Sequence, residues 1–149
     1  MNIVICGSID FTPKIKEIAD ILSDQGHKVD IPLTSQRIIN GELILEDFLD
    51  EKKKNGDTCF RESALRKIQD DVIKHYYQKI ADSDVILVLN LDKKGIPNYI
   101  GGNTFLEMGF AHVLNKKIYL YNNIPDISYT DEINTMKPII IGGDLLKIK

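Results

Sequence analysis

The sequence predicts an α/β fold in which a five-stranded parallel sheet carries helices on both faces. Short apolar runs rich in β-branched residues alternate with segments whose apolar residues recur at helical spacing, as in strands joined by crossover helices. The run at residues 84–90 is apolar almost without interruption, which is typical of a strand buried on both faces. A length of 149 residues fits one domain with its own core, so residues 1–149 are expected to form a single unit.

The first elements form a strand–helix–strand unit. Residues 3–6 predict a buried strand. Thr12 is the expected N-cap of the helix that follows, with Pro13 at its first position, and Gly26 ends that helix. Residues 28–32 predict a second strand, placed near the sheet edge by its charges and its terminal proline.

The periodic spacing of apolar residues weakens over residues 34–61 and returns after residue 61. Residues 43–49 predict one short helix, and the charge run at 50–57 favours a solvated insertion over a functional lid. Residues 62–82 predict a long helix with Tyr76 on its apolar face. The remaining elements are a glycine-rich loop at 91–103, a helix at 105–115, a strand at 117–121, a weak helix at 130–136 and a strand at 138–141.

The expected sheet order locates a site before any chemistry is considered. For a chain of this size the flavodoxin-like order 2-1-3-4-5 is the natural arrangement, and ligands of such sheets bind at the carboxyl ends of the strands where the order reverses. Loops at residues 7–12, 91–103 and 122–126 should meet there. Ser8 and Glu107 are therefore expected in one site.

Glu107 follows the glycine-rich loop, and two interpretations of it stand side by side. A carboxylate in the first turn of a helix should stay ionised at neutral pH, so it could act as a nucleophile or electrostatic stabiliser at an anomeric carbon. Thr104 and Glu107 also have the spacing of a capping box, in which the glutamate folds back on the N-cap amide. Spacing alone favours the cap.

Composition and motifs exclude several other functions. The formal net charge of −3 makes a nucleic acid polymer an unlikely partner, and no apolar segment approaches the length of a membrane span. The glycine-rich loop has neither the Walker ending nor Gly-x-Gly-x-x-Gly, so neither a triphosphate nor a dinucleotide cofactor is expected. The histidines lack a recognised metal-ligand spacing, so no metal is expected. Two unrelated cysteines, Cys6 and Cys59, and the absence of a signal-peptide layout predict a cytoplasmic protein with free thiols.

Three segments together resemble a known family. These are Cys6-Gly7-Ser8-Ile9, the stretch at residues 81–88, and the stretch at 102–111 with its Glu-x-Gly-x-Ala pattern, followed by Lys116-Lys117-Ile118. The chain resembles the nucleoside 2-deoxyribosyltransferase-like proteins, which include deoxynucleoside monophosphate N-glycosidases. The resemblance covers most of the chain apart from residues 34–61.

This resemblance implies a flavodoxin-like fold and an enzyme that cleaves the base–sugar bond of a nucleoside or nucleotide. Glu107 would attack the sugar C1′ to give a covalent glycosyl-enzyme, and water or a second base would then take the sugar. The pocket would be formed by Gly7, Ser8, Asp92, Gly101, Gly102 and Asn103.

The chain also departs from that family at three positions. Tyr76, beside His75, stands where the family carries an acid that assists the leaving base, so His75 or Tyr76 would have to replace it. Asp10 stands where the monophosphate enzymes carry an arginine, and Val4 replaces an aromatic residue. The missing acid and arginine motivate a second hypothesis beside the enzyme, a non-catalytic nucleotide-binding module of the same fold.

Two expectations concern partners. In the family, a neighbouring chain closes the pocket, so the resemblance implies a homo-oligomer, at least a dimer. The apolar surface for this contact would be supplied by Leu43, Leu45, Phe48, Leu49, Tyr76 and Tyr77. A third interpretation, a protein-interaction domain, rests on residues 41–57 alone.

Overall fold

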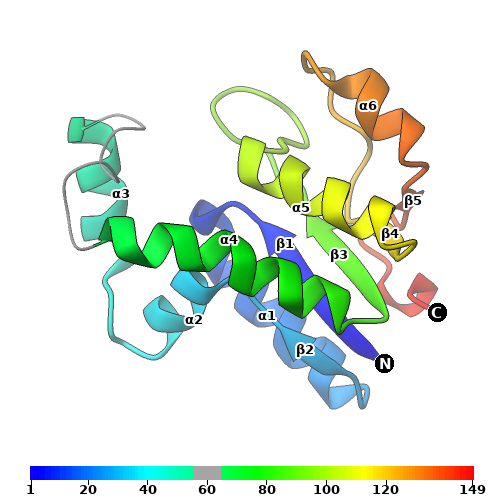
Figure 1. Cartoon of the computed structure of the whole chain (residues 1–149), viewed down its shortest axis with the longest axis horizontal. Helices are drawn as coiled ribbons and strands as arrows, with labels where there is room; N and C mark the ends of the chain where they lie inside the picture. The colour runs from blue at the N-terminus through cyan, green and yellow to red at the C-terminus, as the bar shows by residue number, and fades with distance from the viewer. Residues whose placement is uncertain (56–64) are drawn as a thin grey trace.

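The structure, a computed structural model, describes residues 1–55 and 65–149. Within these residues five parallel strands form one sheet in the order β2-β1-β3-β4-β5, which confirms the predicted fold class and order (Figure 1). The strands are β1 (Asn2–Gly7), β2 (Lys28–Asp30), β3 (Val85–Leu89), β4 (Lys117–Leu120) and β5 (Ile139–Ile140).

The strands are joined by helices that lie on both sides of the sheet. They are α1 (Thr12–Asp24), α2 (Leu33–Ile39), α3 (Leu45–Asn55), α4 (Leu65–Ala81), α5 (Gly102–Val113) and α6 (Thr130–Thr135), with the 3₁₀ turns η1 (Ile9–Phe11) and η3 (Leu145–Lys147). None of the helices in the described residues is long and apolar enough to cross a membrane.

Side chains of β1 alternate between two apolar layers, as the period of a strand requires. Ile3 and Ile5 pack with α1 on one face of the sheet. Val4 and Cys6 pack on the other face, with α4, α5 and α6. All five residues of β3 are buried, as the uninterrupted apolar run predicted. The face that holds Cys6 is the one on which the candidate site lies.

The helix after β1 begins differently from the prediction. Thr12 is the first residue of α1 and Phe11 is its N-cap, because η1 runs directly into the helix. The hydroxyl of Thr12 instead donates to the carbonyl of Ile9 at 2.6 Å and lies 2.8 Å from the hydroxyl of Ser35 in α2. Thr12 therefore fastens α2 to the start of α1, and the prediction of a threonine N-cap was wrong.

The segment after β2 is more ordered than the weak pattern suggested. The structure contains α2, which the sequence did not predict, and α3 extends from the predicted short helix into the charge run as far as Asn55. Cys59, the end of the charge run at residues 56–57 and the predicted helical residues 62–64 lie outside the described residues. The rest of the long helix is confirmed as α4.

Candidate active site

Glu107 lies in the second turn of α5, not in the first. Gly101 is the N-cap, and its carbonyl accepts the amide of Phe105 at 2.8 Å, so the helix starts earlier than the apolar pattern indicated. Thr104 is a buried residue within the first turn, and no side chain caps the helix. The capping-box interpretation was therefore wrong, because a helix that begins at Gly102 leaves Thr104 no N-cap role.

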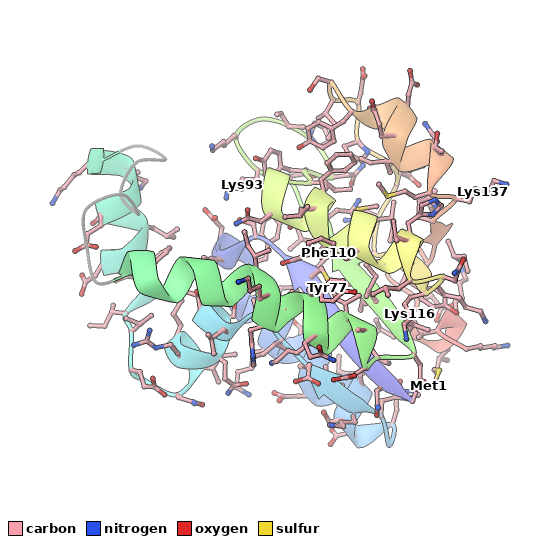
Figure 2. All side chains as sticks on the ribbon, viewed as in Figure 1. Met1, Tyr77, Lys93, Phe110, Lys116 and Lys137 are labelled. Atoms are coloured by element: carbon pink, nitrogen blue, oxygen red, sulfur yellow. The ribbon has the colours of Figure 1, made fainter. Side chains whose placement is uncertain are left out.

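Glu107 faces a pocket formed between α4 and α5. The pocket is small, with a cavity volume of about 30 Å³, and its lining residues are Ile73, Tyr76, Asn103, Leu106, Glu107 and Phe110. Beside it the ring of Tyr77 in α4 meets that of Phe110 edge to face, with centroids 5.3 Å apart, and Figure 2 shows these two side chains pointing toward one another. This contact fixes the spacing of the two helices at the pocket.

The Glu107 carboxyl holds a proton at neutral pH. Its burial raises its pKa from 4.5 to about 8, because a charge in a poorly solvated site is costly, and an interaction with the Cys6 thiol opposes the rise. The expectation that Glu107 stays ionised at neutral pH was wrong. That expectation relied on the helix dipole stabilising the charged carboxylate. The dipole acts within the first turn, and Glu107 lies beyond the first turn.

The two residues expected to assist the leaving base, His75 and Tyr76, point in different directions. Tyr76 is buried, lines the pocket with Glu107, and donates its hydroxyl to the carbonyl of Ile5. Burial raises the pKa of Tyr76 well above its usual value, and the nearby Cys6 and Glu107 add to the rise. His75 is exposed and is not among the pocket residues. The structure therefore brings Tyr76 to Glu107 and leaves His75 on the outer side of α4.

Substituting Tyr76→Phe should lower the free energy of unfolding by about 1–2 kcal/mol, because the ring still packs while the carbonyl of Ile5 loses a buried donor. Chemical denaturation measures this change. Activity assayed as release of free base should stay within about tenfold of wild type, since a phenol with a raised pKa that is already donating to the backbone is a poor acid for a leaving group. A loss of a hundredfold or more in a folded Tyr76→Phe protein would instead assign the hydroxyl to the chemistry.

The predicted binding residues surround the carboxyl ends of β1 and β3 in different ways. Gly7 ends β1 so close to β3 that a Cβ atom would lie 3.1 Å from the carbonyl oxygen of Leu89. At Gly101 a Cβ would meet the ring of Tyr99 at 3.3 Å, whereas Gly102 has open space around it. Asn103 lines the pocket. At Gly7 a side chain would press on the backbone of β3, so glycine favours the close approach of the two strands, whereas at Gly101 it would meet only the side chain of Tyr99.

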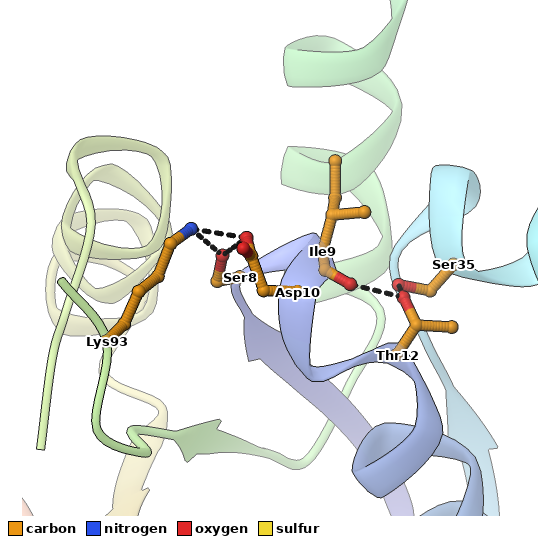
Figure 3. Close-up of polar contacts among 6 residues, drawn as sticks. All are labelled: Ser8, Ile9, Asp10, Thr12, Ser35 and Lys93. Atoms are coloured by element: carbon orange, nitrogen blue, oxygen red, sulfur yellow. Dashed lines mark hydrogen bonds and ion pairs between the residues drawn. The ribbon is translucent and has the colours of Figure 1, made fainter. Parts of the chain in front are cut away.

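Ser8 belongs to a polar bridge that joins the loops after β1 and β3 (Figure 3). Its hydroxyl donates to Asp10 at 2.7 Å and accepts from the Lys93 ammonium at 2.6 Å, while Lys93 also forms an ion pair with Asp10. Burial alone would raise the pKa of Asp10, but the hydrogen bonds from Lys93 and Ser8 outweigh it and lower that pKa. The sequence drew attention to Ser8 and Asp10 but gave no signal for Lys93, which lies more than 80 residues away.

The loop that carries Lys93 has a fixed internal shape. Lys93 and Ile96 exchange backbone hydrogen bonds of 3.1 and 2.9 Å, and the amide of Tyr99 donates to Leu91 at 2.9 Å. Asp92, which is exposed, accepts the amide of Asn98 at 2.9 Å and so shapes this loop from within. We refer to residues 91–101 as the β3–α5 loop.

A third loop is tied to β3 by Asn90. The Asn90 side chain accepts the amide of Asn122 at 2.8 Å and donates to the carbonyl of Asn123, also at 2.8 Å. The Lys93 bridge therefore joins the loop after β3 to the loop after β1, and Asn90 joins the loop after β3 to the loop after β4. In the described part of the chain no group of three or more His, Cys, Asp or Glu side chains could hold a metal ion.

Fold and site together define an open α/β protein with a carboxyl group in a pocket beside the carboxyl end of its first strand. No family model and no curated protein matches the chain in sequence. Among solved structures, the Clostridium botulinum CMP N-glycosidase BcmB is similar, with a TM-score of 0.51 and 13% identity over 94% of this chain and 85% of that chain. At this identity the likeness supports the fold alone.

Proposed function

We propose that this chain is an N-glycosidase or deoxyribosyltransferase that cleaves the base–sugar bond of a nucleoside or nucleotide, with Glu107 as its nucleophile. The observation that carries the proposal is the position of the Glu107 carboxyl, in a pocket between α4 and α5 and against Cys6 near the end of β1. A protein with a similar fold, the CMP N-glycosidase, is an enzyme of the proposed class.

The proposed chemistry uses the carboxylate form of Glu107. An oxygen of the carboxylate attacks C1′ and forms a C1′–O bond, while the C1′–N bond breaks and its electron pair leaves with the base, which takes up a proton. Water or a second base then attacks C1′, and the carboxylate is released. Positive charge develops at C1′ in both steps, and a carboxylate beside it lowers both barriers.

Incubation with a panel of deoxynucleosides and their monophosphates, with free base measured by chromatography, tests this proposal. Because only the carboxylate attacks and its pKa is about 8, kcat/KM for base release should rise about tenfold per pH unit below about pH 8 and level off above it. Activity that falls as the pH rises through 8 would show that protonated Glu107 is the reactive form. Absence of both base release and base exchange across the panel would rule out the proposed activity.

The protonated state of Glu107 gives specific support to a second candidate, a nucleotide-binding module without turnover. At pH 7 a pKa of about 8 leaves roughly one molecule in ten with the nucleophilic carboxylate, and the hydroxyl of Tyr76 is already engaged. This candidate predicts that a nucleotide raises the melting temperature while no base is released at any pH. Slow turnover that depends on Glu107 would count against it.

We also propose that the chain assembles with a second copy through α4 and α5. Ile73, Tyr77, Leu106 and Val113 are large apolar side chains on these two helices that are 40% exposed or more, and two of them line the pocket. An exposed apolar area of this kind is a common feature of association sites. Of the residues expected to supply such surface, Tyr76 is buried within the chain and so does not contribute, while Leu43, Leu45, Phe48 and Leu49 are half-buried.

Light scattering at micromolar concentration should therefore give the mass of a dimer or a larger assembly. Replacing Val113, the most exposed of the four, with glutamate should shift the protein to the monomer, because an ionised carboxyl resists burial in an apolar contact. Ile44→Glu is the matched control, since Ile44 is also exposed but belongs to neither α4 nor α5. A wild-type protein that is monomeric at this concentration would exclude the assembly.

A further inference from the structure

The polar bridge between the loops after β1 and β3 is a pair of hydrogen-bond donors that converge on one carboxylate. The Asp10 carboxylate accepts the hydroxyl of Ser8 at 2.7 Å and also accepts the ammonium of Lys93. Lys93 donates to the hydroxyl oxygen of Ser8 at 2.6 Å as well, so each of the three groups contacts the other two (Figure 3). An ammonium and a hydroxyl arranged in this way are suitable donors for a phosphate or a carboxylate. Asp10 therefore stands where an anionic ligand would accept them.

The bridge is partly shielded from solvent. The side chain of Lys93 is only 12% exposed and that of Asp10 is 30% exposed. The ring of Tyr99 covers the ammonium of Lys93, whose nitrogen lies 5.6 Å from the ring centroid. A cation held away from water in this way needs a counter-charge, because an unpaired charge in such a place is costly. Asp10 supplies that charge from within the chain, so the bridge as a whole is neutral.

The bridge lies at the end of the strand that borders the Glu107 pocket. Tyr76, which lines that pocket, donates its hydroxyl to the carbonyl of Ile5 in β1. Ser8 follows Ile5 by three residues and has an extended backbone, so it lies about 10 Å farther along the direction of the strand. Ligands of open parallel sheets bind along this edge, and a nucleotide is long enough to span such a distance. The bridge is therefore within reach of a ligand whose reacting carbon is at Glu107.

We propose that Asp10 is a specificity-determining residue: it occupies the donors of Ser8 and Lys93 and thereby excludes the phosphate of a ligand from this edge of the sheet. For its consequence the inference rests on the proposed function, since it makes uncharged nucleosides the preferred substrates over their 5′-monophosphates. A phosphate at the bridge would meet donors already in use and a carboxylate of the same charge. A sugar hydroxyl meets no such repulsion and can donate to the Asp10 carboxylate.

Removing the carboxylate should turn the bridge into an anion site. Asp10→Ala leaves the hydroxyl of Ser8 and the ammonium of Lys93 without their acceptor, so inorganic phosphate can take its place. Asp10→Asn keeps the size of the side chain without its charge and decides the outcome if the alanine variant folds poorly. The double variant Asp10→Ala/Lys93→Met lacks the cation as well. Asp24→Ala is the matched control, because Asp24 is exposed at the end of α1 and its loss changes the net charge equally.

Melting curves in inorganic phosphate, compared with sodium chloride at the same ionic strength, measure this binding without a substrate. Phosphate at about 20 mM should raise the Tm of each folded Asp10 single variant by about 2 °C or more, because a ligand of the folded state stabilises it. Wild type, Asp24→Ala and the double variant should show no rise beyond the chloride control. Equal stabilisation of wild type and the Asp10 variants, no stabilisation of any Asp10 variant, or stabilisation that survives Lys93→Met would each overturn the proposal.

Base release then distinguishes this inference from the proposed function. A deoxynucleoside should be a better substrate of wild type than its 5′-monophosphate, and Asp10→Ala should raise the ratio of kcat/KM for the monophosphate to that for the nucleoside by about tenfold or more. Phosphate stabilisation of the Asp10 variants without base release from any protein would support the role of Asp10 and overturn the proposed activity. Base release whose preference for the monophosphate is unchanged by Asp10→Ala would overturn the role of Asp10 and leave the activity intact.

Discussion

Replacing Glu107 with glutamine is expected to reduce base release by at least about a thousandfold while the fold survives. The amide has nearly the shape of the protonated carboxyl that the structure favours at neutral pH, so the contacts with Cys6 and the lining of the pocket should persist. It cannot form the ester bond to C1′, and an interaction needed only in the chemical step is lost from kcat rather than from binding.

Single-turnover measurements of base release, together with a melting curve, are the appropriate readouts for Glu107→Gln. Ground-state contacts come mainly from the other pocket residues, so a nucleotide should still raise the melting temperature of the variant. Glu132→Gln, at an exposed glutamate of α6, is the matched control and should release base at the wild-type rate. Base release that survives Glu107→Gln would exclude the nucleophile role whatever the fold resembles.

The second large effect concerns the dependence of stability on pH. The pKa of Glu107 is about 8 in the folded chain against 4.5 for an ordinary glutamate, so between these pH values the folded state holds a proton that the unfolded state has released. Raising the pH therefore favours unfolding: the contribution of Glu107 is fully present below about pH 4.5 and is lost by about pH 8. The loss is on the order of 4–5 kcal/mol over this window.

Glu107→Gln should abolish this slope, because an amide does not titrate. Denaturant unfolding at pH 5 should give similar free energies of unfolding for wild type and variant, and at pH 8.5 the variant should be more stable by several kcal/mol. Glu132→Gln should follow the wild-type curve at every pH. Parallel curves for wild type and Glu107→Gln between pH 5 and 8.5 would show that the carboxyl is ionised in the folded chain throughout this range.

The sheet could be predicted from the sequence because its signal is local. The strands show as short apolar runs, and the segments between them fix parallel connections. α2 was missed because what holds it is the contact of Ser35 with Thr12, 23 residues earlier in the chain. The start of α5 was misplaced since the N-cap Gly101 and the first two helical residues, Gly102 and Asn103, include no apolar residue to mark it.

The site could be predicted only as a set of candidates. Spacing and resemblance pointed to Glu107, and the strand order brought Ser8 to the same edge of the sheet. The protonation state of Glu107 depends first on its burial, which Cys6 opposes, and the polar bridge between the loops after β1 and β3 depends on an ion pair between Asp10 and Lys93. These partners are separated by tens of residues, so neither contact leaves a periodic trace in the sequence.

The hydrogen bonds inside the β3–α5 loop lower the entropy cost of binding for any ligand that contacts this loop. The pair between Lys93 and Ile96, with the contact of Asp92 to Asn98, restrains the loop backbone before any ligand arrives, and Lys93 fastens the loop to the end of β1. Ordering a free loop costs conformational entropy for each residue that becomes fixed, and this cost weakens binding. A ligand that contacts this loop would meet a backbone already restrained, so less of its contact energy is spent on ordering the loop.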